Sequence, residues 1–360
     1  MKGLLRFLSP MAPDQSGAAA VLYDMDCITV ICDAGGCTGN ICGFDEPRWQ
    51  EKPGAVFSAG LRDMDAILGR DDRLVEKLAD AAKRVDASFT AIIGTPVPAV
   101  IGTDYKALTR MMEKECGMPA IAVECTGTRL YEEGASETYL TLFRRFAARV
   151  ENAETKKETE ISGKKIAGIL GMTPLDISLR DGRPYFTSSK RYQIYDEIYT
   201  YGMGSGFEAV KNAANVSETI LVSPSGLKAA QFLEKKFGIP YRWDYPFIGE
   251  SLSRKLTALA GRRVLIVHQQ TAASAAREQI EEAGASDVNC ATWFLQPEEL
   301  KREGDLRLET EAQFAELCRE GGYDAIVGDP EFLRAARMLG YQGKLVVFPH
   351  FAVSGVLADE

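Results

Sequence analysis

Four of the chain's eight cysteines lie close together near the N-terminus, at every fifth position from Cys27 to Cys42. A β-branched run leads into the turn Asp33-Ala-Gly-Gly-Cys37, and a second glycine-containing segment ends at Cys42. A thiolate on a glycine turn beside the start of a helix is well placed to bind metal, because a helix start lowers the pKa of the thiol. These residue types therefore indicate a metal site.

The regular spacing does not describe four ligands to one cluster from a single chain. Cys27 and Cys32 flank the predicted strand 28–31, and five extended residues cover about 16 Å. Their odd offset also points the two side chains to opposite faces of a sheet. Cys37 is the strongest candidate ligand, and Cys42 and Cys32 are next. Cys37 and Cys42 would lie about 140° apart on a regular helix, but Gly39 permits a looser turn.

Other patterns that could carry chemistry are weaker. The remaining cysteines are expected to be core or surface residues, as free cysteines usually are. Close Cys-x-x-Cys pairs are absent, and only His268 and His350 could add imidazole to a zinc site. Each of these histidines is expected to be structural. The segment Gly202–Gly206 follows no clear strand, and no Walker loop occurs, so we expect no nucleotide hydrolysis by this chain.

Composition limits the class of protein. A chain of 360 residues should form two or three domains. The net charge of -9 argues against a nucleic-acid partner, because no excess of cations is available to neutralise phosphates. The N-terminus does not read as a signal peptide, and no apolar run is long enough to cross a bilayer. We therefore expect a soluble cytoplasmic protein, in which clustered cysteines bind metal or catalyse more often than they form disulfides.

The elements that must position these residues fall into three blocks. In each block, short apolar strands alternate with helical patterns, which predicts an α/β fold of three Rossmann-like parallel-sheet domains. The predicted boundaries are 1–150 for a cluster-binding domain, 151–165 for a polar linker, 166–260 for the second domain and 261–360 for the third. The predicted strands are 28–31, 91–94, 120–124, 166–171, 219–222, 264–268, 325–327 and 344–348. The predicted helices are 61–84, 104–115, 136–150, 206–214, 225–237 and 272–283, and 241–249 is a predicted loop.

Three loops of the first domain should meet at one edge of its sheet. Ligands of open parallel sheets bind beyond the carboxyl ends of the strands. The loops that follow the first three predicted strands are 33–37, 95–98 and 125–128. We therefore expect a site where these loops come together.

Several segments of the first block are similar to one known family. The chain resembles the N-terminal domain of nitrogenase component 1 proteins, which include the molybdenum-iron protein subunits, their cofactor-assembly homologues and the dark-operative protochlorophyllide reductases. The resemblance covers roughly the first 135 residues and is weaker beyond them. The segments that carry it are Pro13–Ala19, Asp33–Cys37, Phe57–Gly69, Ile93–Asp104 and Ala122–Gly127.

The resemblance implies a fold, a cofactor and a partner. Such proteins are dimers of three-domain subunits with an iron-sulfur cluster at the subunit interface, bound by cysteines of the first domain. A separate ATP-dependent iron-sulfur reductase of the nitrogenase iron protein type docks there and delivers electrons one at a time. The electrons pass to a substrate or cofactor between the domains.

The sequence departs from the family pattern at the ligand positions. Family members commonly have three cysteines per cluster-binding chain, and only the middle one is matched, by Cys37. Pro13 and Pro96 stand at the other two positions, and a proline side chain cannot bind metal. A twofold homodimer would restore four ligands to one bridging [4Fe-4S] cluster if each chain supplied Cys37 and either Cys42 or Cys32. Dinitrogen reduction is not expected of so short a chain.

The sequence therefore predicts a nitrogenase-like homodimer that passes low-potential electrons to a small molecule other than dinitrogen. Gly35 and Gly36 would give the backbone room at the cluster, and Asp33 would contact it or accept a nearby hydrogen bond. Fold logic alone places the substrate between the blocks, near Thr95, Thr126 and Gly171. One alternative is a non-catalytic scaffold for a cluster or cofactor precursor. The other is a metal-free ligand-binding module with structural cysteines.

Overall fold

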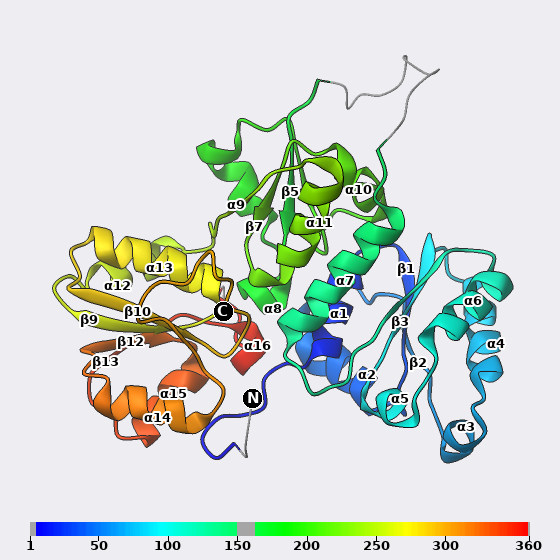
Figure 1. Cartoon of the computed structure of the whole chain (residues 1–360), viewed down its shortest axis with the longest axis horizontal. Coiled ribbons are helices and arrows are strands. Elements are labelled where there is room, and N and C mark those ends of the chain that lie inside the picture. The colour runs from blue at the N-terminus through cyan, green and yellow to red at the C-terminus, as the bar shows by residue number, and fades with distance from the viewer. Residues whose placement is uncertain (1–4, 150–162, 359–360) are drawn as a thin grey trace.

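The computed structural model of the chain describes residues 5–149 and 163–358 and contains three parallel β-sheets (Figure 1). Every strand pairing within the sheets is parallel, and helices pack against each sheet. The predicted fold class, three Rossmann-like parallel-sheet regions, is confirmed. Within the described residues, no helix combines the length and apolar character that a membrane span requires.

The first sheet has the strand order β2-β1-β3-β4. Its central strands, β1 (Cys27–Ile31) and β3 (Phe89–Ile93), are buried at every residue. Their β-branched and aromatic residues suit strands that are covered on both faces. The edge strands are β2 (Val56–Ser58) and β4 (Ala120–Val123). The helices of this region are α1 (Asp14–Leu22), α2 (Gly36–Asn40), α3 (Asp63–Leu68), α4 (Asp71–Ala82), α5 (Pro96–Ile101), α6 (Tyr105–Cys116) and α7 (Tyr131–Phe146).

The second sheet has the order β6-β5-β7-β8 and is built around the fully buried strand β5 (Ile166–Leu170). Its other strands are β6 (Glu197–Thr200), β7 (Glu218–Leu221) and β8 (Tyr241–Trp243). The helices are α8 (Pro174–Ile177), α9 (Arg183–Ser188), α10 (Phe207–Lys211) and α11 (Leu227–Phe237). Of the predicted linker 151–165, residues 151–162 lie outside the described residues, and Gly163–Lys165 lead into β5.

The third sheet has the order β11-β10-β9-β12-β13. Its strands are β9 (Arg263–Val267), β10 (Asp287–Thr292), β11 (Leu306–Arg307), β12 (Ala325–Gly328) and β13 (Lys344–Val347). The helices are α12 (Glu250–Thr257), α13 (Gln270–Glu282), α14 (Glu311–Glu320), α15 (Pro330–Met338) and α16 (Phe351–Ser354). The N-terminal segment also packs here, because the backbone N–H groups of Arg6, Phe7 and Leu8 donate to the carboxylate of Glu311.

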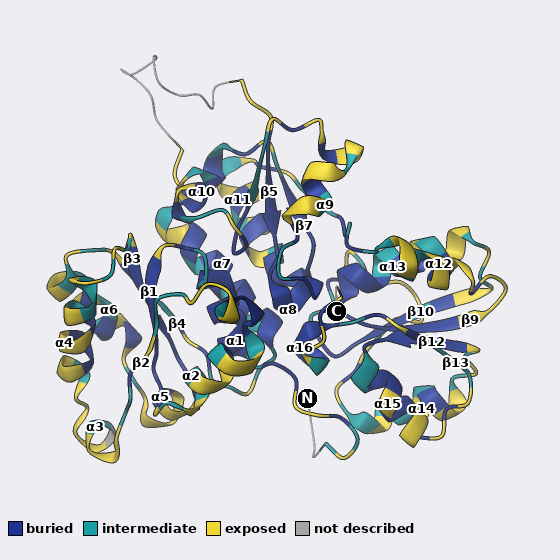
Figure 2. Cartoon of the chain, turned by 180° about the vertical axis from the view of Figure 1, so that it is seen from behind, coloured by how far each residue is buried: buried dark blue, intermediate teal, exposed yellow. Residues whose placement is uncertain are grey.

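Helices α1 and α7 pack tightly at the centre of the molecule, between the three sheets (Figure 1). Every residue of α1 is buried, and so are most residues of α7 (Figure 2). Two glycines permit the close approach. A Cβ added to Gly17 would lie 1.9 Å from the backbone oxygen of Tyr131, and one added to Gly134 would lie 1.8 Å from that of Asp14. Only glycine fits at either position.

Several predicted elements differ from the structure. The single helix predicted over 61–84 is wrong, because the chain forms α3 and α4 with a break at Gly69, whose φ of 62° is left-handed. The predicted loop 241–249 begins with strand β8 instead, which completes the edge of the second sheet. Helix α7 also begins at Tyr131, earlier than predicted.

Candidate metal centre at the carboxyl edge of the first sheet

The loops that follow β1, β3 and β4 meet at the carboxyl edge of the first sheet, as expected. The Thr95 hydroxyl, after β3, donates a 2.8 Å hydrogen bond to the carbonyl of Cys32, after β1. The loop after β4 packs against the loop after β3, because a Cβ added to Gly127 would lie 2.5 Å from Cγ of Pro96. The fold therefore brings segments that are far apart in sequence to one edge.

The Asp33 carboxylate fixes the turn that carries Cys37. It is 1% exposed and accepts hydrogen bonds from the Thr38 backbone N–H at 2.8 Å, the Thr38 hydroxyl at 3.0 Å and the Ser58 hydroxyl at 2.6 Å. These bonds tie the start of α2 to the end of β2. Asp33 therefore acts as the acceptor that positions the turn.

The glycines of the turn border open space. Gly35 has a φ of 118°, which favours glycine, and it stands immediately before α2. A Cβ added to Gly35, Gly36 or Gly39 would meet no other atom within 4 Å. The room that the sequence predicts beside Cys37 is therefore present.

Cys37 and Cys42 lie on one continuous helical segment and are both half-buried. Helix α2 runs directly into a π-helical stretch over Ile41–Asp45, in which the Glu46 N–H donates to the Ile41 carbonyl at 2.9 Å. Single π-helical turns widen a helix locally and are frequent at functional sites. The looser turn that Gly39 permits after Cys37 is therefore the π-helical stretch Ile41–Asp45.

The prediction that the pKa of Cys37 is lowered overall is wrong. Burial raises the pKa of the Cys37 thiol, and the negative charge of Asp33 adds to the effect. Burial also raises the pKa of Cys42, with a contribution from Glu46. Hydrogen bonds from Thr95 and from the Cys37 backbone N–H lower the pKa of Cys37, but by less than burial raises it. Both thiols are therefore protonated at neutral pH.

Cys32 takes a different position from Cys37 and Cys42. As the odd offset predicts, Cys27 and Cys32 pack into hydrophobic clusters on opposite faces of the first sheet. Cys32 is 3% exposed, and burial raises its pKa to about 12. Its thiol belongs to the core, so the placement favours Cys42 as the companion of Cys37.

An apolar band, which the sequence analysis did not identify, lies on elements of the first region, which also carries the two half-buried cysteines. Eight of the twelve large hydrophobic residues that are exposed in the described chain lie on α3, α5, β2 and the π-helical stretch. Val100 is 85% exposed and Phe44 is 75% exposed. Figure 2 shows the exposed surfaces of α3 and α5 at the same end of this region. The members of the apolar band are Phe44, Phe57, Met64, Ile67, Leu68, Val97, Val100 and Ile101.

A signal for the apolar band is present in the sequence. The run Pro96–Ile101 is apolar throughout, although a helix on a sheet needs an apolar stripe on one face only. Only Pro98 of this run is buried. Apolar residues beyond the buried stripe predict a contact surface.

A cleft of about 520 Å³ opens beside Cys42, between the residues that follow it and helix α16. Its walls include Phe44, Asp45 and Ser354. The substrate positions predicted from fold logic are less open. Thr95 is fully buried, and a Cβ on Gly171 would lie 2.8 Å from Cβ of Ser223. Neither residue lines this cleft.

The two histidines lie together inside the molecule. Their rings stack with centroids 4.5 Å apart, and both are fully buried. His268 Nε2 lies 3.0 Å from the Pro349 carbonyl, and His350 Nε2 lies 2.9 Å from the Tyr131 hydroxyl. Burial lowers the pKa of His268 to about 4 and that of His350 well below its usual value. This placement agrees with a structural role.

A buried carboxylate joins all three regions next to the histidines. Glu132, on α7, accepts hydrogen bonds from the Leu295 N–H at 2.6 Å and the Ser223 hydroxyl at 3.5 Å. Asp176 lies nearby and accepts from the Thr173 hydroxyl at 2.6 Å. Burial raises the pKa of Asp176 to about 6 and that of Glu132 well above its usual value. Within 5–149 and 163–358, no three His, Cys, Asp or Glu side chains are grouped to hold a metal ion.

Comparisons with known proteins agree with this architecture. The family model for nitrogenase component 1 type oxidoreductases matches residues 15–283. Two solved structures of nitrogenase Cp1, at pH 6.5 and at pH 5, match with a TM-score of 0.70 and 13% sequence identity each. The alignments cover 97% and 99% of this chain, and 88% and 86% of those chains. No curated protein matches the chain. At 13% identity, the likeness to nitrogenase Cp1 shows the fold alone.

Proposed function

Because this chain belongs to the nitrogenase component 1 type oxidoreductase family, we propose that it is an electron-transferring iron-sulfur protein. Its substrate is a small molecule other than dinitrogen. The observation that carries this proposal is the segment that bears Cys37 and Cys42, half-buried beside open glycines at the carboxyl edge of the first sheet. That edge is where open parallel sheets bind their ligands.

Two copies of the chain form the complete site in this proposal. Cys37 and Cys42 of each copy supply two thiolates, so a twofold axis through the site gives the four ligands of one bridging [4Fe-4S] cluster. The apolar band, which includes Phe44 and Val100, supports the homodimer, because exposed apolar residues concentrated at one end of a molecule mark a contact surface.

The residues around the thiols have defined tasks. Gly35 and Gly36 leave the space that a cluster would occupy, and Asp33 holds the turn in place. The thiols of Cys37 and Cys42 must each lose a proton when metal binds, since the thiolate is the ligand. A bound [4Fe-4S] cluster would supply one-electron transfer at low potential. The apolar band would exclude water from it in the dimer.

The proposal includes two further partners. An ATP-dependent iron-sulfur reductase of the nitrogenase iron protein type delivers the electrons. The small-molecule substrate occupies the cleft of about 520 Å³ beside Cys42, which is the described opening next to the proposed ligands and has a suitable volume. Asp45 and Ser354, in its walls, offer polar contacts to such a molecule.

The test is anaerobic iron and sulfide analysis, with absorption spectra, of the wild type and of Cys37→Ala, Cys42→Ala and Cys116→Ala. Cys116 is a matched control, because it is also a free, half-buried cysteine but lies at the end of α6. We expect about four irons per dimer in the wild type and in the control, and loss of iron in the other two variants. Iron retained in Cys42→Ala but lost in Cys32→Ala would move the second ligand to Cys32.

Two outcomes separate this proposal from its alternatives. A cluster that is released to an acceptor protein, with no reoxidation by any substrate after reduction, would indicate a scaffold for a cluster precursor. A colourless wild type that takes up no iron on reconstitution would indicate a metal-free ligand-binding module.

A further inference from the structure

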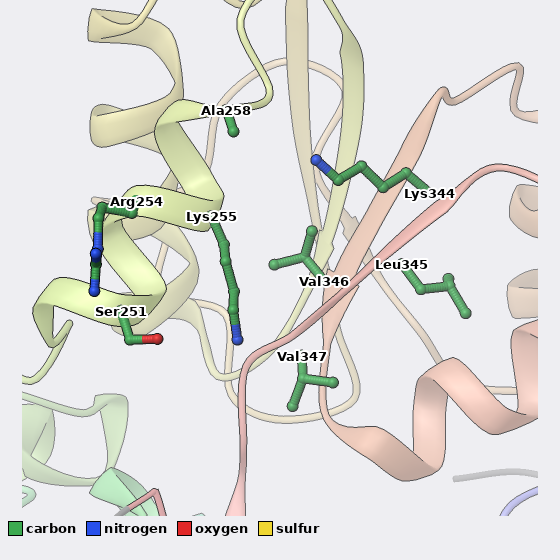
Figure 3. Close-up of a pocket in the computed structure, with 8 residues that line it drawn as sticks. All are labelled: Ser251, Arg254, Lys255, Ala258, Lys344, Leu345, Val346 and Val347. Carbon is green, nitrogen blue, oxygen red and sulfur yellow. The ribbon is translucent and has the colours of Figure 1, made fainter.

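A groove of about 510 Å³ lies at the far edge of the third sheet, between helix α12 and strand β13 (Figure 3). The strand lines it with residues 344–347. The helix lines it with four exposed residues spaced by three, one and three positions, which is the spacing of a single helix face. These residues are Ser251, Arg254, Lys255 and Ala258.

The groove exposes unpaired backbone groups of β13. This strand is the last of its sheet and pairs with β12 on one side only. The Lys344 N–H donates to the Asp324 carbonyl at 2.9 Å, and the Phe348 N–H donates to the Gly328 carbonyl at 2.8 Å. Because the hydrogen-bonding direction alternates along a strand, the N–H and C=O groups of Leu345 and Val347 point to the open edge.

The side chains around the groove make it positively charged. Arg254 and Lys255 come from the helix and Lys344 from the strand, and all three are exposed. None of the three forms an ion pair with any residue that the structure describes. In Figure 3, the Lys344 side chain extends from the strand toward α12. Three unpaired cations stand out in a chain with a net charge of -9.

We propose that this groove binds an acidic, extended polypeptide segment, which adds a strand to β13. A phosphate or another simple anion only accepts hydrogen bonds, whereas the open edge of Leu345 and Val347 presents both donors and acceptors. A backbone satisfies both, as in other complexes in which a peptide extends a sheet. The three cations then select an acidic segment over a neutral or basic one.

The geometry also defines the side-chain pattern of the bound segment. Successive side chains of a strand point to opposite faces. Only every second side chain of the segment therefore faces α12, where acidic groups meet Arg254 and Lys255. The other side chains lie on the face of Val347, which is 44% exposed and suits an apolar contact. The expected ligand thus alternates acidic and apolar residues.

The first test is fluorescence anisotropy of the full chain with a labelled eight-residue peptide of alternating glutamate and valine. We expect saturable binding that weakens as salt rises. Lys255→Glu should weaken binding by about tenfold or more, because it replaces an attraction by a repulsion. Lys235→Glu is the matched control, because Lys235 is also exposed in the last turn of a helix, α11, and it should bind as the wild type does.

The second test separates strand addition from simple charge attraction. Val347→Pro removes an N–H that points outward and leaves the bonds of β13 to β12 in place, so it should abolish binding. A peptide N-methylated at alternate residues lacks the same hydrogen bonds without any change to the protein. Its binding to the wild type should be no stronger than the binding of the parent peptide to Val347→Pro. The proposal is overturned if the N-methylated peptide binds as well as the parent peptide, or if no peptide binds. It is also overturned if tripolyphosphate, added at the same concentration of negative charge, displaces the parent peptide.

Discussion

The Asp33 carboxylate has two effects on Cys37. Its hydrogen bonds to Thr38 and Ser58 hold the turn, and an ordinary hydrogen bond of this kind contributes about 1 kcal/mol to stability. Its charge also raises the pKa of the Cys37 thiol, in addition to the effect of burial. Asp33, which holds the turn, therefore also favours the protonated thiol of Cys37 until a metal ion binds.

Replacement of Asp33 by asparagine should make Cys37 more reactive in the metal-free protein. Asn keeps an acceptor for the turn but removes the negative charge, so the pKa of the thiol falls and more thiolate is present at pH 8. We expect several-fold faster alkylation of Cys37 by iodoacetamide, measured by mass spectrometry. Alkylation of Cys116, on α6, is the internal control. Equal rates in wild type and Asp33→Asn would contradict the electrostatic role of Asp33.

Part of this site could be predicted from the sequence, and the rest could not. The turn at Gly35 and Gly36 is local, so its residue types were enough to predict it. The direction of the Cys37 pKa shift was not predictable, because burial by the surrounding fold and the charge of Asp33 decide it. The pairing of His268 with His350 likewise depends on the packing of strands distant in the chain.

Among the helices, α1 and α7 form the central contact of the molecule. The contact rests on Gly17 and Gly134, each of which faces a backbone oxygen of the other helix. A glycine inside a helix is normally unfavourable relative to alanine by about 1 kcal/mol. Its presence at both positions is explained by the packing, which leaves no space for a Cβ.

Gly134→Ala should destabilise the protein strongly. The new Cβ would lie 1.8 Å from the Asp14 oxygen, so α1 and α7 must move apart, at a cost of about 3 kcal/mol or more. Gly39→Ala is the control, because Gly39 is also helical but has no atom within 4 Å of the added Cβ. Urea unfolding followed by circular dichroism measures both. A Gly134→Ala variant as stable as the wild type would mean that the two helices are not this close.

Elements with a strong apolar pattern were predictable and polar ones were not. The buried strands β1, β5 and β9 were predicted within one or two residues from their β-branched runs. Strand β10 was missed because Asp287 and Asn289 interrupt its apolar residues, and its neighbours in the sheet stabilise it. The break between α3 and α4 was missed because apolar periodicity continues across Gly69.

At the scale of the whole molecule, ionisable residues with opposite pH dependence lie where the three sheets meet. Asp176 and Glu132 have raised pKa values, so burial favours their protonated forms. His268 and His350 have lowered pKa values, so burial favours their neutral forms. The carboxyl groups contribute stability that is lost as pH rises through their folded-state values. The histidines contribute stability that is lost as pH falls below about 6.5, their unfolded-state value.

The substitution Asp176→Asn should stabilise the protein more at pH 8 than at pH 5. The wild-type Asp176 ionises as pH rises through about 6, well above the unfolded value of about 3.9, so its burial costs up to about 3 kcal/mol at high pH. Because asparagine cannot ionise, the Asp176→Asn variant avoids that loss of stability. Urea unfolding at both pH values measures the effect, with the exposed Glu316→Gln as the control. An equal effect of Asp176→Asn at both pH values would contradict the raised pKa.

Val100→Glu should dissociate the proposed homodimer. Val100 is 85% exposed in the apolar band, so a charge there would be desolvated on association. Light scattering after size exclusion should give twice 39.4 kDa for the wild type and 39.4 kDa for the variant. Met338→Glu, at an exposed apolar residue on α15, should leave the mass unchanged. A monomeric wild type that binds iron would rule out a bridging cluster.

The position of Glu132 has a consequence for how this gene can be divided. The carboxylate extends from α7 and takes its hydrogen-bond donors from Ser223 in the second region and Leu295 in the third. A fragment that ends after the first sheet would keep Glu132 and lose both donors, and one that ends after the second sheet would lose the Leu295 N–H. We therefore expect the three regions to depend on one another for stability, and recombination between relatives should succeed best when Glu132, Ser223 and the Leu295 loop are inherited together.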